Sequence, residues 1–335
     1  MRLFIFLFLC LFSVQFYAQE QQLAYQYYRN GEYEKAISIY KKLHEQNPIN
    51  TNYLNYLINC YQQTEAFEEV TDLINVNLKK HPKNQYLLVE LGYNFDLQHL
   101  PEKATPYYNE ALKKIKEIPN LGYIIGKTFQ DNHLLDYALQ AYLKAMEITP
   151  TANYNFQVAQ IYGEKGDIEN MFSTYLNLIE TNEQFETNVK NYVGRFITDD
   201  SENENNTKLK RLLLIRNQNN PTNAWNRLLS WLFVQQKEYN KALIQEKALY
   251  KRNPESLVSI INIGKIAFSD KEYTTSEDSF NYVLKNTKKQ ELKLMANLFL
   301  LQIKMETSND NLAIENIFEE LFTINGKNKN TVNIK

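Results

Sequence analysis

The sequence predicts an all-α fold built from repeated helix–turn–helix units. Apolar residues recur at i, i+3, i+4 and i+7, which is the helical period. The chain holds only 9 glycines and 8 prolines in 335 residues, which favours long helices and short turns over a many-stranded sheet. A related phrase also recurs in four segments: GEYEKAISIYKKLHEQNP (Gly31–Pro48), LLDYALQAYLKAMEITP (Leu134–Pro150), KEYNKALIQEKALYKRNP (Lys237–Pro254) and KEYTTSEDSFNYVLKN (Lys271–Asn286).

The repeat has a period of about 34 residues. Its small position is occupied by Ala36, Val70, Ala104, Ala138, Met171, Ala242 and Ser276. The apolar position four residues later is occupied by Tyr40, Ile74, Tyr108, Tyr142, Tyr175 and Phe280, and the series is broken by Glu246. His99 and His133 stand at the turn position that Gly31 occupies in the first unit. A single hairpin cannot bury its own apolar face, so we expect the hairpins to stack into one continuous core.

This spacing and these residue types resemble the tetratricopeptide repeat family over most of residues 20–290. The resemblance implies a right-handed superhelical solenoid of about eight to nine antiparallel helix–turn–helix repeats. In that family the first helices of successive hairpins line a concave groove. Another solenoid of helical hairpins with a similar period remains the alternative.

The N-terminus is typical of an export signal. Arg2 precedes an apolar run from Leu3 to Phe12, which is too short to span a bilayer comfortably. We predict a signal peptide over residues 1–18, with cleavage after Ala18, and an exported protein that is periplasmic or associated with the cell envelope. Lipidation of Cys10 and retention of the segment as an anchor are the alternatives. Nothing after residue 20 approaches transmembrane length.

The remaining chain divides into four expected segments. Repeats 1 to 5 occupy residues 19–185, and repeats continuing to a C-terminal hairpin (helices 291–304 and 311–322) occupy residues 223–323. Between them, residues 186–222 form a degenerate repeat, with helices at 187–197 and 208–216 joined by an exposed acidic loop, DDSENENN, at 199–206. This segment could act as a hinge between two blocks. Residues 324–335 are expected to be a polar tail.

The sequence contains no recognisable catalytic or metal-binding motif. Lys and Arg total 37 and Asp and Glu total 39, so the formal net charge of −2 disfavours a dedicated nucleic-acid binder. The four histidines lack zinc-site spacing, and no phosphate-binding glycine loop or nucleophile elbow occurs. Cys60 is the one cysteine left after signal removal and is expected to be a buried apolar residue. We therefore predict no catalytic residue, no metal and no cofactor.

The resemblance places certain first-helix residues in the groove. They are Tyr25, Tyr28, Asn52, Asn55, Asn59, Gln62, Tyr93, Tyr123, Lys127, Gln130, Phe156, Gln160 and Trp231. This set is rich in amides, which can pair with an extended backbone, and in aromatic rings, which are common at binding hot spots. Gln21 and Tyr25 stand where the family's carboxylate clamp would need Lys and Asn, so that clamp is not expected. Asparagine is common throughout the chain, so these positions could also be merely exposed.

The sequence thus predicts a non-enzymatic scaffold that binds a protein or extended peptide in the concave groove, in the cell envelope. An accessory or regulatory subunit of an envelope secretion or outer-membrane assembly machine is the alternative. An enzyme acting on envelope polymers, with carboxylates brought together by distant helices, is a third hypothesis. The expected partner is a protein or peptide and not a nucleic acid, and the oligomeric state stays open.

Overall fold

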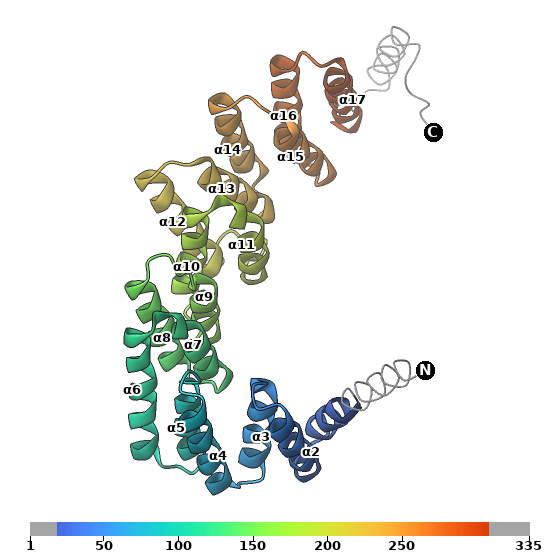
Figure 1. The fold of residues 1–335 in the computed structure, drawn as a ribbon. Helices are drawn as coiled ribbons and strands as arrows, with labels where there is room; N and C mark the ends of the chain where they lie inside the picture. The colour runs from blue at the N-terminus through green and yellow to red at the C-terminus, as the bar shows by residue number, and fades with distance from the viewer. Residues whose placement is uncertain (1–18, 308–335) are drawn as a thin grey trace, which may run out of the picture. The chain divides into compact units, whose positions relative to one another are not determined.

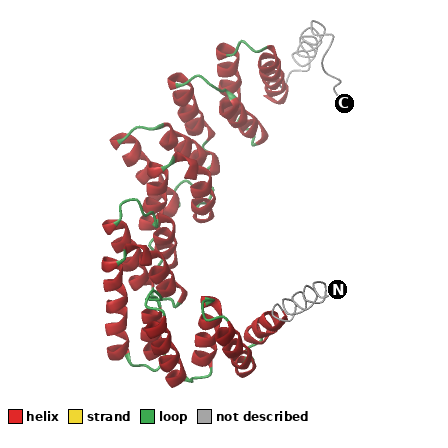
Figure 2. Ribbon diagram, in the orientation of Figure 1, coloured by secondary structure: helices red, strands yellow, loops and turns green. Residues whose placement is uncertain are grey.

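The computed structural model describes residues 19–307, and regular structure in that range is entirely helical (Figure 2). The all-α prediction is therefore confirmed for the described range. The expected signal segment, the second helix of the last hairpin at 311–322 and the polar tail lie outside it. The chain forms two compact units, Met1–Ile161 (unit 1) and Tyr162–Lys335 (unit 2), which are described separately. Among residues 19–307, no helix is both long and apolar enough to cross a membrane.

Unit 1 consists of successive helical hairpins (Figure 1). Residues 19–29 are helical and are followed by α2 (Tyr33–Gln46), α3 (Thr51–Gln63), α4 (Phe67–Lys80), α5 (Leu87–Asp96), α6 (Pro101–Glu117), a 3-10 turn η1 (Pro119–Leu121), α7 (Gly122–Asp131) and α8 (Leu135–Ile148). The last helix, α9 (Asn155–Glu164), runs into unit 2. Helix 19–29 and α3, α5 and α7 are the first helices of four hairpins, and α2, α4, α6 and α8 are the second helices.

The turns within the hairpins of unit 1 share one backbone conformation. Gly31, Glu65, His99 and His133, each 34 residues apart, have positive φ values of 75°, 57°, 59° and 57°. The next residue donates its N–H to the carbonyl five residues back, for example Glu32 to Tyr27 at 2.9 Å and Leu134 to Phe129 at 2.9 Å. This is the hydrogen bond of a Schellman helix end, which requires a left-handed residue at the turn. The predicted equivalence of His99 and His133 with Gly31 is confirmed.

The core follows the predicted frame. The small residues Ala36, Val70, Ala104 and Ala138 are fully buried, and Tyr40, Tyr108 and Tyr142 are at most 2% exposed. Two glycines on first helices leave space for two of these rings. A Cβ atom on Gly92 would lie 2.4 Å from Cε1 of Tyr108, and one on Gly126 would lie 2.7 Å from Cε1 of Tyr142. The two helices of a hairpin therefore approach closely where a glycine faces a tyrosine.

Unit 2 continues with helices of similar length. They are α10 (Ile168–Thr181), a 3-10 turn η2 (Glu183–Phe185), α11 (Glu186–Val193), a 3-10 turn η3 (Gly194–Phe196), α12 (Glu204–Asn219), α13 (Asn223–Gln235), α14 (Tyr239–Arg252), α15 (Val258–Ser269), α16 (Tyr273–Asn286) and α17 (Gln290–Thr307). The left-handed turn residues Lys237 and Lys271, with φ values of 58° and 63°, keep the 34-residue spacing between the pairs α13–α14 and α15–α16.

The interrupted repeat differs from the prediction at its loop. The expected loop at 199–206 is shorter, because α12 already begins at Glu204. Asn203 caps this helix by accepting a hydrogen bond from the Asn205 N–H at 3.0 Å. Asn206 is fully buried, and its Nδ2 donates to the carbonyls of Thr198 and Asp200, each at 2.7 Å. The prediction that the loop at 199–206 is exposed was therefore wrong for Asn206. Its side chain stabilises the turn through these two hydrogen bonds.

Candidate peptide-binding groove

Unit 1 contains a concave pocket of about 550 Å³. All of its lining residues lie in the first helix of a hairpin or directly next to an end of such a helix. They are Tyr28, Thr51, Asn52, Asn55, Tyr56, Asn59, Tyr86, Glu90, Ile124, Lys127, Thr128, Asp131 and Asn132. Four consecutive hairpins therefore contribute to a single site.

Helical spacing on α3 presents three asparagines to the pocket. Asn52, Asn55 and Asn59 lie at i, i+3 and i+7, while Leu54 and Leu57 on the other face are buried. Asn50 fixes the start of the helix, because its side chain accepts a hydrogen bond from the Asn52 N–H at 3.1 Å. The amide row is therefore carried by a capped helix with a buried opposite face.

Tyrosines from neighbouring hairpins hold two of these asparagines. The Tyr28 hydroxyl donates to Oδ1 of Asn59 at 3.0 Å, and the Tyr86 hydroxyl donates to Oδ1 of Asn55 at 3.0 Å. Burial raises the pKa of both tyrosines, so both hydroxyls stay protonated and keep donating. The hydrogen bonds occupy the amide oxygens, and neither Nδ2 group has a further partner within residues 19–307.

Aromatic rings form one wall of the pocket. Tyr56 stacks on Tyr40 with ring centroids 5.0 Å apart and an angle of 12°, and it meets Tyr28 edge to face at 5.0 Å and 66°. Tyr25 extends this cluster, with its ring 5.8 Å from that of Tyr56. Such contacts hold rings in fixed positions, and a bound chain would pack against a preformed surface.

Glu90 on α5 is the least exposed of the charged residues that line the pocket. Its side chain is partly accessible, and Asn132 Nδ2 lies 3.4 Å from its Oε1. Burial raises the pKa of Glu90 to about 7; the nearby Asp131 carboxylate adds to this rise, while the amides of Asn132 and Gln62 oppose it. No salt bridge in the described part of the chain involves Glu90. Near neutral pH this carboxyl therefore exchanges readily between its neutral and ionised forms.

A second carboxylate in the pocket already has a cation. Lys127 Nζ lies 2.8 and 2.7 Å from the two carboxylate oxygens of Asp131, one turn further along α7. Both side chains are about half exposed, so they form an ordinary solvent-exposed salt bridge. Lys127 is therefore engaged with Asp131 and does not neutralise Glu90.

The structure gathers some of the predicted groove residues and separates others. Those that line the pocket are Tyr28, Asn52, Asn55, Asn59 and Lys127, and Tyr25 lies beside them. Gln62 is only 6% exposed and lies next to Glu90, beneath the surface. The other predicted residues in unit 1 lie outside the pocket lining: Tyr93, Tyr123, Gln130, Phe156 and Gln160. Trp231 belongs to unit 2.

Sequence reasoning missed Glu90. Tyr56, Glu90 and Ile124 are each 34 residues apart, so they occupy one position in successive hairpins, and all three line the pocket. The feature that could have revealed Glu90 is its position between two apolar residues, Val89 and Leu91, which are both buried. A charged residue flanked by core residues marks a position at the edge of the core.

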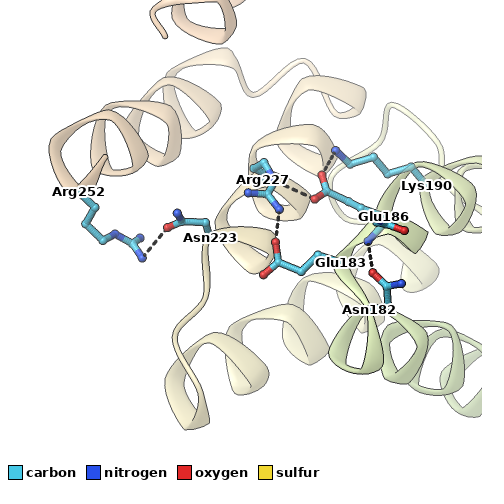
Figure 3. Close-up of polar contacts among 8 residues, drawn as sticks. Asn182, Glu183, Glu186, Lys190, Asn223, Arg227 and Arg252 are labelled. Carbon is cyan, nitrogen blue, oxygen red and sulfur yellow. Dashed lines mark hydrogen bonds and ion pairs between the residues drawn. The ribbon is translucent and has the colours of Figure 1, made fainter. Parts of the chain in front are cut away.

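In unit 2, α11, α13 and the turn η2 before α11 carry an ion-pair network (Figure 3). Arg227 on α13 pairs with Glu186 at 2.7 Å and with Glu183 at 2.8 Å, and Lys190 pairs with Glu186 at 2.7 Å. Burial opposes the charge of Arg227, but the two carboxylates raise its pKa. Here the chain neutralises its own acidic residues, which leaves less charge for a partner.

The possible metal-ligating side chains within residues 19–307 are dispersed, and the cysteine is buried. No set of three or more His, Cys, Asp or Glu side chains lies close enough to hold a metal ion in that range. Cys60 is fully buried, and burial raises the pKa of its thiol to about 12, so the thiol is protonated at neutral pH.

Comparisons with known proteins find only weak structural similarity. No known family matches the chain, and no curated protein matches it either. Among solved structures, a tetratricopeptide repeat protein from Parabacteroides merdae is similar to 87% of this chain over 99% of its own length, at 15% identity and a TM-score of 0.28. The C-terminal part of a tetratricopeptide repeat protein from Cytophaga hutchinsonii is similar to 81% of the chain over 97% of its length, at 12% identity and a TM-score of 0.31.

A structure of Naa15 and Naa10 bound to HypK gives a similar result. The likeness covers 93% of this chain at 12% identity and a TM-score of 0.31. This chain spans 59% of the length of the matched chain. The helical-hairpin repeats themselves are established by the 34-residue recurrence of buried small residues and left-handed turns described above.

Proposed function

We propose that this protein is a non-enzymatic scaffold whose unit 1 binds an extended segment of a protein partner in the pocket. The observation that carries the proposal is the pair of tyrosine-held asparagines, Asn55 and Asn59. Their amide nitrogens are oriented by hydrogen bonds formed within the protein, so a ligand need not order them.

The spacing of these amides suits an extended backbone. Residues four apart on a helix are separated by about 6 Å along its axis. Carbonyl groups on one side of an extended chain recur every two residues, or about 6.8 Å. Asn55 and Asn59 can therefore donate to two such carbonyls, while the rings of Tyr28 and Tyr56 pack against the side chains between them.

The size of the pocket agrees with this ligand. Its volume of about 550 Å³ lies within the range of roughly 300–1,000 Å³ that is typical of ligand sites. Because four hairpins line it, the pocket follows the direction in which the hairpins stack. A chain segment of a few residues fits such a shape.

The test is affinity capture from solubilised cells with a matched control. The pocket variant carries Asn55→Ala and Asn59→Ala. The control carries Asn75→Ala and Asn109→Ala, which change exposed asparagines on the second helices α4 and α6, outside the pocket. We expect one protein to be retained by the wild type and the control and lost by the pocket variant, with all three equally folded by circular dichroism. Equal retention by the pocket variant would exclude this pocket as the binding surface.

We also propose that the protein acts in the cell envelope after export. The support is the sequence of residues 2–18, where a basic residue precedes a short apolar run. N-terminal sequencing of the protein purified from its native cells tests this. A mature chain that begins near Gln19 supports export and cleavage, whereas an intact Met1 in a cytoplasmic fraction contradicts them.

A further inference from the structure

Glu90 is a pocket carboxyl that has no cationic partner within residues 19–307. By contrast, Asp131 is paired with Lys127, and Glu183 and Glu186 are paired with Arg227. Glu90 has only the Asn132 amide, at the long distance of 3.4 Å. An ionised carboxylate that is withdrawn from water without a cation is unfavourable. A cation supplied from outside would relieve that penalty.

Two neutral donors nevertheless favour the charged form of Glu90. Asn132 donates to it from the end of α7, and Gln62 lies beside it from α3. Gln62 is 94% buried, and its amide nitrogen has no hydrogen-bond partner within residues 19–307, yet it lies close enough to Glu90 to lower the pKa of that carboxyl. Amide groups from two other hairpins therefore lie next to the carboxyl, and neither of them carries a positive charge.

We propose that the pocket selects a partner segment that carries a lysine or arginine, whose cationic group pairs with Glu90. This inference rests on the peptide-binding function proposed above. The segment's carbonyls accept hydrogen bonds from Asn55 and Asn59 on α3, and the long basic side chain reaches across to Glu90 on α5. Its apolar stem passes the rings of Tyr56 and Tyr86, which suits the amphipathic character of Lys and Arg.

The same charges disfavour acidic segments. Glu90 and Asp131 both line the pocket, and Lys127 compensates only one of them, so the pocket carries a net negative charge. A glutamate or aspartate in the bound segment would face like charge in a poorly solvated site, and like charges opposed across an interface reduce affinity strongly. Specificity therefore comes from attraction of basic residues together with repulsion of acidic ones.

The experiment is selection from a displayed library of random dodecapeptides on three forms of the full-length protein: wild type, Glu90→Gln and Glu90→Lys. Glu183→Gln is the matched control, because it removes a carboxylate that Arg227 already neutralises in unit 2. We expect wild type and Glu183→Gln to enrich peptides with a fixed Lys or Arg. Glu90→Gln should enrich peptides without that preference, and Glu90→Lys should shift it toward Asp or Glu.

An enriched synthetic peptide then provides a quantitative test. Replacing its basic residue with glutamine should weaken binding to wild type by about tenfold or more, and binding to Glu90→Gln by less than about twofold. Peptides enriched on wild type without a basic residue would overturn the inference and leave the peptide-binding function standing. If no peptide is enriched on any form, both proposals fail. Thermal unfolding of each variant ensures that lost binding does not reflect lost fold.

Discussion

The Tyr86 hydroxyl donates a hydrogen bond to Oδ1 of Asn55 over 3.0 Å, although 31 residues separate the two in sequence. Asn55 lies on the first helix of the second hairpin, and Tyr86 precedes the first helix of the third. The orientation of a pocket-lining amide is thus fixed by the packing of one repeat on the next. The pocket is a product of stacking and not of any single hairpin.

Replacing Tyr86 with phenylalanine tests whether the orientation of Asn55 affects binding apart from the stability of the fold. We expect Tyr86→Phe to lose about 1 kcal/mol of unfolding free energy with its hydrogen bond and to bind peptide more weakly, because Asn55 is no longer held. Tyr53→Phe is the control: its hydroxyl donates to Gln21 at the same distance of 3.0 Å, but it does not line the pocket. Urea unfolding and peptide titration check both variants. A similar loss of affinity in Tyr53→Phe would mean that general loosening, and not the Asn55 orientation, matters.

Glu90→Gln should stabilise the unliganded protein at alkaline pH. The pKa of Glu90 is about 7 in the folded protein, compared with about 4.3 when unfolded. Below pH 4 the carboxyl is protonated in both states. Between about pH 4.3 and pH 7 the unfolded chain ionises this carboxyl while the folded state keeps it protonated, so the folded state loses stability across that interval and little more above it. The difference between wild type and variant should therefore be small at pH 4 and grow to at most about 4 kcal/mol at pH 8. Unfolding curves at both pH values measure it, and a constant difference would contradict the buried-carboxyl description.

Affinity for a basic peptide should rise with pH between 6 and 8. Glu90 must be ionised to pair with a cation, and its ionised fraction grows about tenfold over that interval for a pKa of about 7. The charged or titratable groups around it are Asp131 and Lys127 on α7 and Tyr86 and Tyr93 on or beside α5. Burial raises the pKa of both tyrosines, so they stay neutral across the interval. Calorimetric titration of wild type and Glu90→Gln tests this, and the variant should show little pH dependence.

Gly126→Ala should destabilise unit 1. An exposed Gly→Ala change within a helix normally stabilises by up to about 1 kcal/mol. Here the added Cβ would lie 2.7 Å from Cε1 of the Tyr142 ring. We expect a net loss of about 1–3 kcal/mol from overpacking, measured by urea unfolding. The double change Gly126→Ala with Tyr142→Leu should recover part of the loss, and a stabilising single variant would show that the helices are not in close contact.

The sequence was informative about the fold because the repeat imposes the same physical demand every 34 residues. Ala36, Ala104 and Ala138 recur where two helices approach closely, and the structure buries all three. His99 and His133 could be matched to Gly31 on spacing alone, and all three have left-handed backbones. The start of α12 was less predictable, since it depends on the capping side chain of Asn203.

The pocket was only partly predictable, because some of its features do not follow the 34-residue period. Asn55 and Asn59 were found because a groove position repeats within each first helix. Glu90 escaped because its equivalents, Tyr56 and Ile124, are aromatic and aliphatic, so nothing in the frame marks that position as polar. Its character depends on Gln62 and Asn132, which come from other hairpins. Such contacts between repeats are set by packing and not by the period.

Site-specific photo-crosslinking in the native cells tests the central claim most directly. A photoreactive amino acid at Asn52, an exposed residue of the pocket, is compared with one at Asn75, an exposed residue of α4 outside it. The account predicts a discrete crosslinked product from position 52 that disappears when Asn55→Ala and Asn59→Ala are added, and no such product from position 75. A product from position 75 alone, or one from position 52 that persists in the combined variant, would contradict binding in this pocket.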